Sequence, residues 1–229
     1  AEDLKLDGRR QRVSHESIYA YIYEDKKRGG DLHTHLRGQK AYRKRNGSND
    51  RRGKILGRVS ISERPLVVEF RCRYGDFEID TIHFKGHKGA IVSIVERRSR
   101  LTLLKEIPRN TAENVEKAVI ELLEQYGRKV HTVTSDNGRE FANHAAIADS
   151  LNAQFFFCDA YASWQRGTNE NTNGLVRQYF PKSRSYESVK PEEIQNAVNR
   201  LNNRPRKCLG FKSPNEVLFK IKPEVALGS

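Results

Sequence analysis

Methionine is absent from the 229 residues, tryptophan occurs once and cysteine three times. Cys72, Cys158 and Cys208 are widely spaced and odd in number, and no C-x-x-C occurs. This pattern argues against a disulfide framework and against a structural zinc site, and it fits a reducing compartment. No apolar run reaches 18 residues, and no signal peptide is visible, so the sequence predicts no membrane-spanning segment. Because the chain lacks Met and begins with Ala1, we expect a fragment from which an N-terminal part is missing.

Acidic residues are scarce relative to basic ones, with 29 Asp and Glu against 42 Lys and Arg, a formal net charge of +13. Such an excess favours a polyanionic partner, because basic side chains displace condensed counterions from phosphates. Residues 26–58 contain twelve Lys or Arg and only two acids, Asp31 and Asp50. By composition alone, a solvated loop explains this segment as well as a nucleic-acid-binding segment does. It has no amphipathic apolar face, which disfavours a membrane surface.

The hydrophobic pattern predicts an α/β fold. Three strands at 77–84, 90–96 and 101–107 have short connections, which favours an antiparallel meander. Helices and strands then alternate, with helices at 111–126, 139–151, 168–181, 191–203 and from 213, and strands at 130–134 and 153–157. A meander followed by this alternation predicts a mixed five-stranded sheet with helices on its faces. A further short helix is predicted at 13–24, where Ser14 is a suitable N-cap.

Three acids occupy positions typical of a metal-dependent site. Asp80 lies within the first strand, Asp136 directly follows the fourth strand, and Glu170 begins a helix after a loop. Three converging carboxylates can hold two Mg²⁺ ions ~3.5–4 Å apart, which activate a nucleophile and stabilise a leaving oxygen on phosphorus. Each acid also has an ordinary explanation as an ion-paired strand residue, an Asx-turn or a first-turn helix acid. Asp76 and Glu78 share a strand face with Asp80, so periodicity leaves the choice among them open.

The order D…S-D-N-G-R-E-F…R-G-T-N-E-N-T-N-G resembles that of the DDE transposases and integrases, and most closely the IS-thirty family of bacterial insertion-sequence transposases. Similar stretches run nearly the whole length of the chain, and the stretch at 166–182 is very specific. The others are V-S-H-E-S-I-Y (13–19), D-R-R-G-K-I (50–55), G-D-F-E-I-D (75–80), G-H-K-G-A-I-V-S-I-V-E-R-R-S-R (86–100), S-D-N-G-R-E-F (135–141), L-N-N-R-P-R-K-C-L-G (201–210) and S-P-N-E-V-L (213–218). Phe77 and Ile79 depart from the family, standing where Trp and Gly are expected.

The resemblance implies a ribonuclease H-like fold and a catalytic triad of Asp80, Asp136 and Glu170 that binds two Mg²⁺ ions, with Mn²⁺ able to substitute. It implies cleavage at transposon ends followed by strand transfer, in the cytoplasm of a bacterium and at its nucleoid. The implied partners are double-stranded DNA, as transposon inverted-repeat ends and as target, and further copies of the chain in a homodimer or larger assembly. Two alternatives stay open: a ribonuclease H-like nuclease without strand transfer, and a non-catalytic DNA-binding regulator.

The same resemblance suggests contacts with DNA. Arg177 follows Glu170 by seven residues, nearly two helical turns, so both share a helix face, and the family implies a DNA-contacting basic residue there. An exposed surface arginine is the alternative. Asn137 is expected to orient Asp136 or to touch DNA, and Trp164 either to stack on an unpaired base or to fill the core. The further candidates are Arg166, Arg43, Lys44, Arg45, Arg51 and Arg52.

Three parts are predicted along the chain. The helix at 13–24 resembles the second helix of a helix-turn-helix, with the stretch before it as the remnant of its partner helix. We therefore expect residues 1–25 to be the remnant of a DNA-binding region and residues 26–70 a basic DNA-binding linker. Residues 71–229 are expected to form the ribonuclease H-like catalytic domain.

Overall fold

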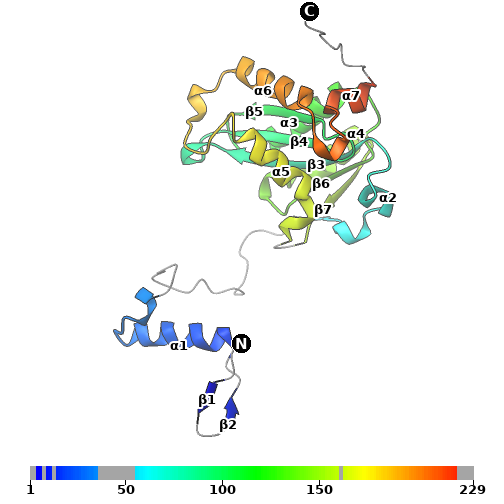
Figure 1. The fold of residues 1–229 in the computed structure, drawn as a ribbon. Coiled ribbons are helices and arrows are strands. Elements are labelled where there is room, and N and C mark those ends of the chain that lie inside the picture. Colours follow the sequence, from blue (N-terminus) through cyan, green and yellow to red (C-terminus); the bar gives the residue numbers. More distant parts are fainter. Residues whose placement is uncertain (1–3, 7–8, 12–13, 36–54, 160–161, 221–229) are drawn as a thin grey trace, which may run out of the picture. The chain divides into compact units, whose positions relative to one another are not determined.

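The computed structural model describes residues 4–6, 9–11, 14–35, 55–159 and 162–220 (Figure 1). The chain divides into two compact units, Ala1–Arg51 and Arg52–Ser229. Some of the predicted DNA contacts lie outside the described residues, namely Arg43, Lys44, Arg45, Arg51, Arg52 and the side chain of Trp164. The predicted three-part division of the chain is not tested by this structure and stays a prediction.

The first unit holds a strand pair and one α-helix. β1 (Leu4–Leu6) and β2 (Arg9–Gln11) pair antiparallel, where the sequence suggests the remnant of a helix. α1 (His15–Lys27) begins after Ser14, whose hydroxyl oxygen accepts a hydrogen bond from the backbone N–H of Ser17. A short 3₁₀ helix, η1 (Leu32–His35), follows. No residue of α1 is fully buried, and in the apolar stripe Ile22 and Tyr23 are half-buried.

The second unit is built on one mixed sheet with the strand order β5-β4-β3-β6-β7, which confirms the predicted five-stranded sheet. Three strands, β3 (Asp76–His83), β4 (Ala90–Glu96) and β5 (Thr102–Ile107), form the antiparallel meander. β6 (Thr132–Ser135) and β7 (Gln154–Phe157) continue the sheet in parallel with β3. Every residue of β4 is buried, because helices pack against both faces of this central strand.

Two hydrophobic clusters cover the two faces of the sheet. The larger joins the odd-numbered face of β3, including Phe77 and Ile79, to α3 (Ala112–Gln125) and α4 (His144–Leu151). The smaller joins Ile82, on the opposite face, to α5 (Gly167–Val176) and α6 (Pro191–Asn203). Since side chains alternate along a strand, Asp76, Glu78 and Asp80 face the side on which α5 lies.

Shorter elements complete the second unit. α7 (Pro214–Phe219) packs on α6, and α2 (Leu66–Glu69) precedes the sheet with Val68 buried. The single-turn 3₁₀ helices are η2 (Ile61–Glu63), η3 (Lys85–His87), η4 (Arg139–Phe141), η5 (Ser163–Arg166), η6 (Tyr186–Ser188) and η7 (Lys207–Leu209). Before the sheet, Ser60 forms a parallel bridge to Phe157 in the edge strand β7.

Two predicted helices are shorter in the structure. The helix predicted at 139–151 is a 3₁₀ turn followed by α4, because Asn143 leaves the helical region with ψ of 24°. The helix predicted at 168–181 ends as α5 at Val176. Pro181 lacks an N–H and restricts the backbone of the residue before it, so regular helix ends ahead of it.

Candidate active site

Asp80 and Asp136 meet because β3 and β6 are parallel neighbours. Their register pairs Glu78 with Thr134, and two further residues along both chains bring Asp80 opposite Asp136. The backbone N–H of Thr81 donates to Asp80 Oδ1 at 2.8 Å, and that of Gly138 donates to Asp136 Oδ1 at 2.8 Å. One oxygen of each carboxylate is therefore fixed by local backbone, and the second oxygen of each remains for another partner.

Arg166 lies between these two carboxylates. Its Nη1 is 3.2 Å from Asp80 Oδ2, and its Nη2 is 3.1 Å from Asp136 Oδ2. The residue is only 7% exposed, and Nη1 also donates to the carbonyl oxygen of Ile79 at 3.2 Å. Burial raises the pKa of Asp80, the Arg166 guanidinium lowers it, and the Asp136 carboxylate raises it again, with a net rise. The acid pair thus needs a cation, and Arg166 supplies it.

The other two acids on this face of β3 have structural partners. Asp76 accepts hydrogen bonds from Arg73 at 2.9 and 3.0 Å and from the Thr132 hydroxyl at 2.8 Å. Glu78 is fully buried, pairs with Arg97, and accepts the backbone N–H of Asn169 in the first turn of α5 at 2.9 Å. A carboxylate at a helix N-terminus is stabilising. Asp80 is thus the acid of this face that shares Arg166 with Asp136, and its catalytic role stays a prediction.

Glu170 lies in the first turn of α5 and its side chain is exposed. Asn173, one turn further along, donates from Nδ2 to Asp80 Oδ2 at 3.0 Å. Residues three apart on a helix are neighbours with Cβ atoms ~5–6 Å apart, so Glu170 lies next to Asn173 and close to its contact with Asp80. Among the described residues, no group of three or more His, Cys, Asp or Glu side chains is arranged to hold a metal ion. The structure thus brings Asp80 and Asp136 together and leaves Glu170 outside their contact.

The acid pair nevertheless has the chemistry of a divalent cation site. The Oδ2 atoms of Asp80 and Asp136 both point at one guanidinium, so a positive charge already occupies the space between them. Carboxylate oxygens are the ligands that Mg²⁺ prefers, and Mg²⁺ keeps several waters, so few protein ligands suffice. The residues present therefore fit a divalent cation in the place that the guanidinium now occupies.

Two of the predicted DNA contacts make intramolecular hydrogen bonds. Arg177 donates from Nη2 to the carbonyl oxygen of His83 at 2.9 Å, and burial lowers the pKa of its guanidinium. Asn137 donates to the carbonyl oxygen of Cys158 at 2.7 Å and accepts from Arg58, which ties the loop after β6 to the end of β7. Contact of either residue with DNA stays a prediction.

Sequence reasoning missed two features of the site. It did not foresee that Arg166, a basic residue in the loop before Glu170, lies between Asp80 and Asp136, although a partly buried acid pair requires a cation. It also gave no role to Glu140 of S-D-N-G-R-E-F. Glu140 Oε1 accepts from the Thr81 hydroxyl at 2.9 Å and from Asn110 Nδ2 at 3.2 Å, directly beside the acid pair.

Comparison with known proteins finds one family match and several similar transposases. Residues 72–163 match the family described as integrase core domain. The chain is 50% identical over 210 residues to the transposase for insertion sequence element IS4351 of Bacteroides fragilis, a match that covers 91% of this chain and 64% of that protein. It is 34% identical over 217 residues to transposase InsI for insertion sequence element IS30A of Escherichia coli strain K12, covering 90% of this chain and 56% of that protein. The chain thus spans less than two thirds of the length of these relatives.

The fold is shared with a solved assembly. A chain of the simian T-cell lymphotropic virus intasome in complex with PP2A regulatory subunit B56 gamma superposes with a TM-score of 0.52 at 19% identity. That match covers 65% of this chain and 55% of the other. The predicted ribonuclease H-like fold is confirmed. In the part of the chain that the structure describes, no helix has the length and apolar character needed to cross a membrane.

Proposed function

Since this chain is a homologue of the IS30-family insertion-sequence transposases and carries an integrase core domain, we propose that it cuts DNA at transposon ends and joins the freed strand to a target. The observation that carries this proposal is the convergence of Asp80 and Asp136 on a single positive charge. Two carboxylates that converge on one positive charge can hold divalent cations for phosphodiester exchange by oxygen nucleophiles, which needs no covalent protein–DNA intermediate.

DDE integrases and transposases use divalent metal ions, and we assign the ligands here to Asp80, Asp136 and Glu170. Two bound Mg²⁺ or Mn²⁺ ions would activate the attacking water or 3′-hydroxyl and stabilise the leaving oxygen. The chain's own residues prepare this site. Backbone N–H groups fix one oxygen of each aspartate, and Asn173 holds α5 against Asp80, one helical turn from Glu170.

Arg166 has a second part in this proposal. Its guanidinium and a divalent cation compete for the same two oxygens, so the acid pair is neutralised both before and after the cation binds. An arginine released from carboxylates beside a cut phosphate is a suitable phosphate ligand. The sequence-based assignment of Arg166 to DNA and its observed position are therefore compatible.

The remaining assignments follow the family. We propose double-stranded DNA as the partner, with transposon ends and target held in a homodimer or larger assembly at the nucleoid in the cytoplasm. The proposed parts are the remnant of a DNA-binding region at 1–25, a basic DNA-binding segment at 26–70 and the catalytic domain at 71–229. Residues 26–58 contain twelve basic residues and two acids, which supports binding of this segment to the phosphate backbone of DNA.

The experiment that tests this function replaces Asp136 with asparagine. Asp136→Asn keeps the shape of the side chain and removes a charged ligand, so cleavage and strand joining with Mg²⁺ should fall on the order of 10²-fold or more. Asp149→Asn, at an exposed position of α4, is the matched control and should retain activity. Wild-type activity in Asp136→Asn would overturn the proposal. Cleavage without joining of a pre-cut 3′-hydroxyl end would instead favour a nuclease, and absence of Mn²⁺ binding by calorimetry would favour a regulator.

A further inference from the structure

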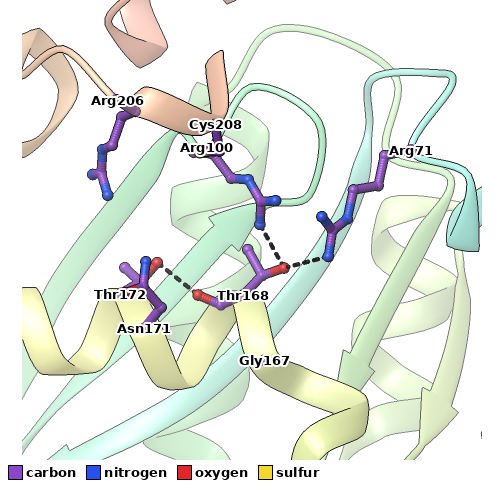
Figure 2. Close-up of a pocket in the computed structure, with 8 residues that line it drawn as sticks. All are labelled: Arg71, Arg100, Gly167, Thr168, Asn171, Thr172, Arg206 and Cys208. Carbon is purple, nitrogen blue, oxygen red and sulfur yellow. Dashed lines mark hydrogen bonds between the residues drawn. The ribbon is translucent and has the colours of Figure 1, made fainter. Parts of the chain in front are cut away.

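A cavity of ≈ 210 Å³ lies beside the first turns of α5, and three of its lining side chains are arginines (Figure 2). Arg71 follows α2, Arg100 lies in the turn between β4 and β5, and Arg206 precedes η7. Three segments that are distant in sequence thus contribute one guanidinium each. The other lining residues are Gly167, Thr168, Asn171, Thr172 and Cys208.

These guanidiniums have little to neutralise them. Arg100 Nη1 and Arg71 Nη2 both donate to the Thr168 hydroxyl, at 2.7 and 3.4 Å, as Figure 2 shows. Arg206 donates to a backbone carbonyl, and its Nε is buried without a partner. In the described part of the chain none of the three forms an ion pair with a carboxylate.

The nearby acids serve other cations. Glu69 is paired with Arg64 and Arg97, and Glu78 with Arg97. The pKa of Arg71 is lowered by partial burial of its guanidinium and by repulsion from Arg100 and Arg97. These effects outweigh the attraction of Glu78 and Glu69, which would raise it. Burial also lowers the pKa of Arg206. The cavity is therefore a place of positive charge that lacks a counter-ion.

The backbone at two of the arginines is unusual. Arg71 has φ of 53° and Arg100 has φ of 64°, in the left-handed region that L-residues other than Asn and Asp seldom adopt. Glycine would adopt this conformation at lower cost. Two arginine side chains are thus directed at one cavity from backbone positions better suited to glycine, and such outliers are grounds for a functional hypothesis.

We propose that this cavity binds a backbone phosphate of DNA other than the phosphate that is cut. The inference rests on the proposed function and deepens it. Guanidinium groups bind phosphate through paired N–H donors, and the Thr168 hydroxyl adds a further polar group. Thr168 and Thr172 are each two residues from Glu170, about 200° around the helix at ~100° per residue. The wall of the cavity that the two threonines form therefore lies on the side of α5 away from Glu170.

Cys208 offers a direct probe, because it is an exposed thiol that lines the cavity. In a Cys72→Ser background it is the one exposed cysteine, since Cys158 is buried and burial raises the pKa of its thiol to about 11. Double-stranded DNA, added without Mg²⁺, should slow maleimide alkylation of Cys208 several-fold. Arg71→Gln/Arg100→Gln should abolish that protection and reduce the slope of log affinity against log salt by about one.

The matched control is Arg128→Gln, an exposed arginine after α3 and away from the cavity, which should keep both the protection and the salt slope. If the double variant fails to fold, Arg71→Gln alone serves, because the Arg71 residue is exposed overall and its hydrogen bond to Thr168 is long, at 3.4 Å. Absence of protection, or equal protection in the parent and the arginine variants, would overturn the inference. Both readouts are independent of cleavage, so they can fail while Asp136→Asn still abolishes activity, and the reverse.

Discussion

Replacing Arg166 with glutamine removes the positive charge between Asp80 and Asp136 and leaves the two carboxylates facing each other. Breaking a buried ion pair on one side costs ~3–5 kcal/mol. Here the Asp136 side chain is 42% exposed, so solvent screening reduces its share. We therefore expect Arg166→Gln to lower the free energy of unfolding by roughly 2 kcal/mol at neutral pH without metal.

The pH dependence of this loss has a definite sign. The pKa of Asp80 is raised in the folded protein, so the stability that Asp80 contributes is fully present below its unfolded pKa and is lost as pH rises through its folded pKa. Arg166 lowers that pKa, and its removal moves the folded pKa higher still. The deficit of Arg166→Gln should therefore be largest at neutral pH and shrink as the solution is acidified and Asp80 binds a proton.

Urea denaturation with and without Mn²⁺ tests both parts. A ligand that binds only the folded state stabilises it by RT ln(1 + [L]/Kd), about 2.7 kcal/mol at 100 times Kd. Mn²⁺ should stabilise Arg166→Gln more than wild type, because the wild-type site must first release its guanidinium. Arg128→Gln is the control for loss of one positive charge. Equal stability of variant and wild type at neutral pH, or equal stabilisation of both by Mn²⁺, would refute this reasoning.

Two further predictions concern the scaffold. Glu78→Gln should lower the free energy of unfolding, measured by urea titration, by ~3 kcal/mol, because it leaves Arg97 underpaired and weakens the contact with the N-terminus of α5. The control is Glu121→Gln, which removes an exposed ion pair with Lys105 and should cost under ~1 kcal/mol in the same titration. Gly75→Ala should cost ~3 kcal/mol or more, because its Cβ would lie 2.3 Å from the carbonyl oxygen of Lys129. Gly86→Ala isolates the backbone term, since φ is also positive there but an added Cβ meets nothing within 4 Å, and it should cost only ~1–2 kcal/mol. Similar midpoints of thermal unfolding for these two glycine variants would contradict the argument from close approach.

Much of the frame could be read from the sequence. The short connections between the first three strands predict the meander, and the helix–strand alternation after it predicts parallel neighbours. Once β6 is parallel to β3 and pairs with its first half, Asp136 at the end of β6 lies beside Asp80 within β3. Asp136 could therefore be located before any contact was known, because it directly follows a strand.

The selection among the acids could not be read in this way. Asp76 and Glu78 differ from Asp80 in their partners and burial, and Arg97 reaches Glu78 from the turn after β4. The position of Arg166 depends on the path of the loop before α5, which periodicity does not describe. The arginine cavity likewise joins three turns that have no common pattern in the sequence. In each case the information lies in tertiary contacts of long side chains.

The contacts of Glu78 have a consequence for how substitutions around it would affect the protein. The same strand holds the acid that meets Asp136 and the acid that holds the first turn of α5, two residues apart. Arg97 pairs with Glu69, which also pairs with Arg64. A substitution among these three residues changes none of the proposed catalytic acids. It should nevertheless weaken the contact of Glu78 with the first turn of α5, because Arg97 also pairs with Glu78. Such variants should be temperature-sensitive. They should be active at low temperature, where α5 stays packed on the sheet, and inactive at moderately higher temperature, where α5 detaches by local unfolding while the sheet remains folded.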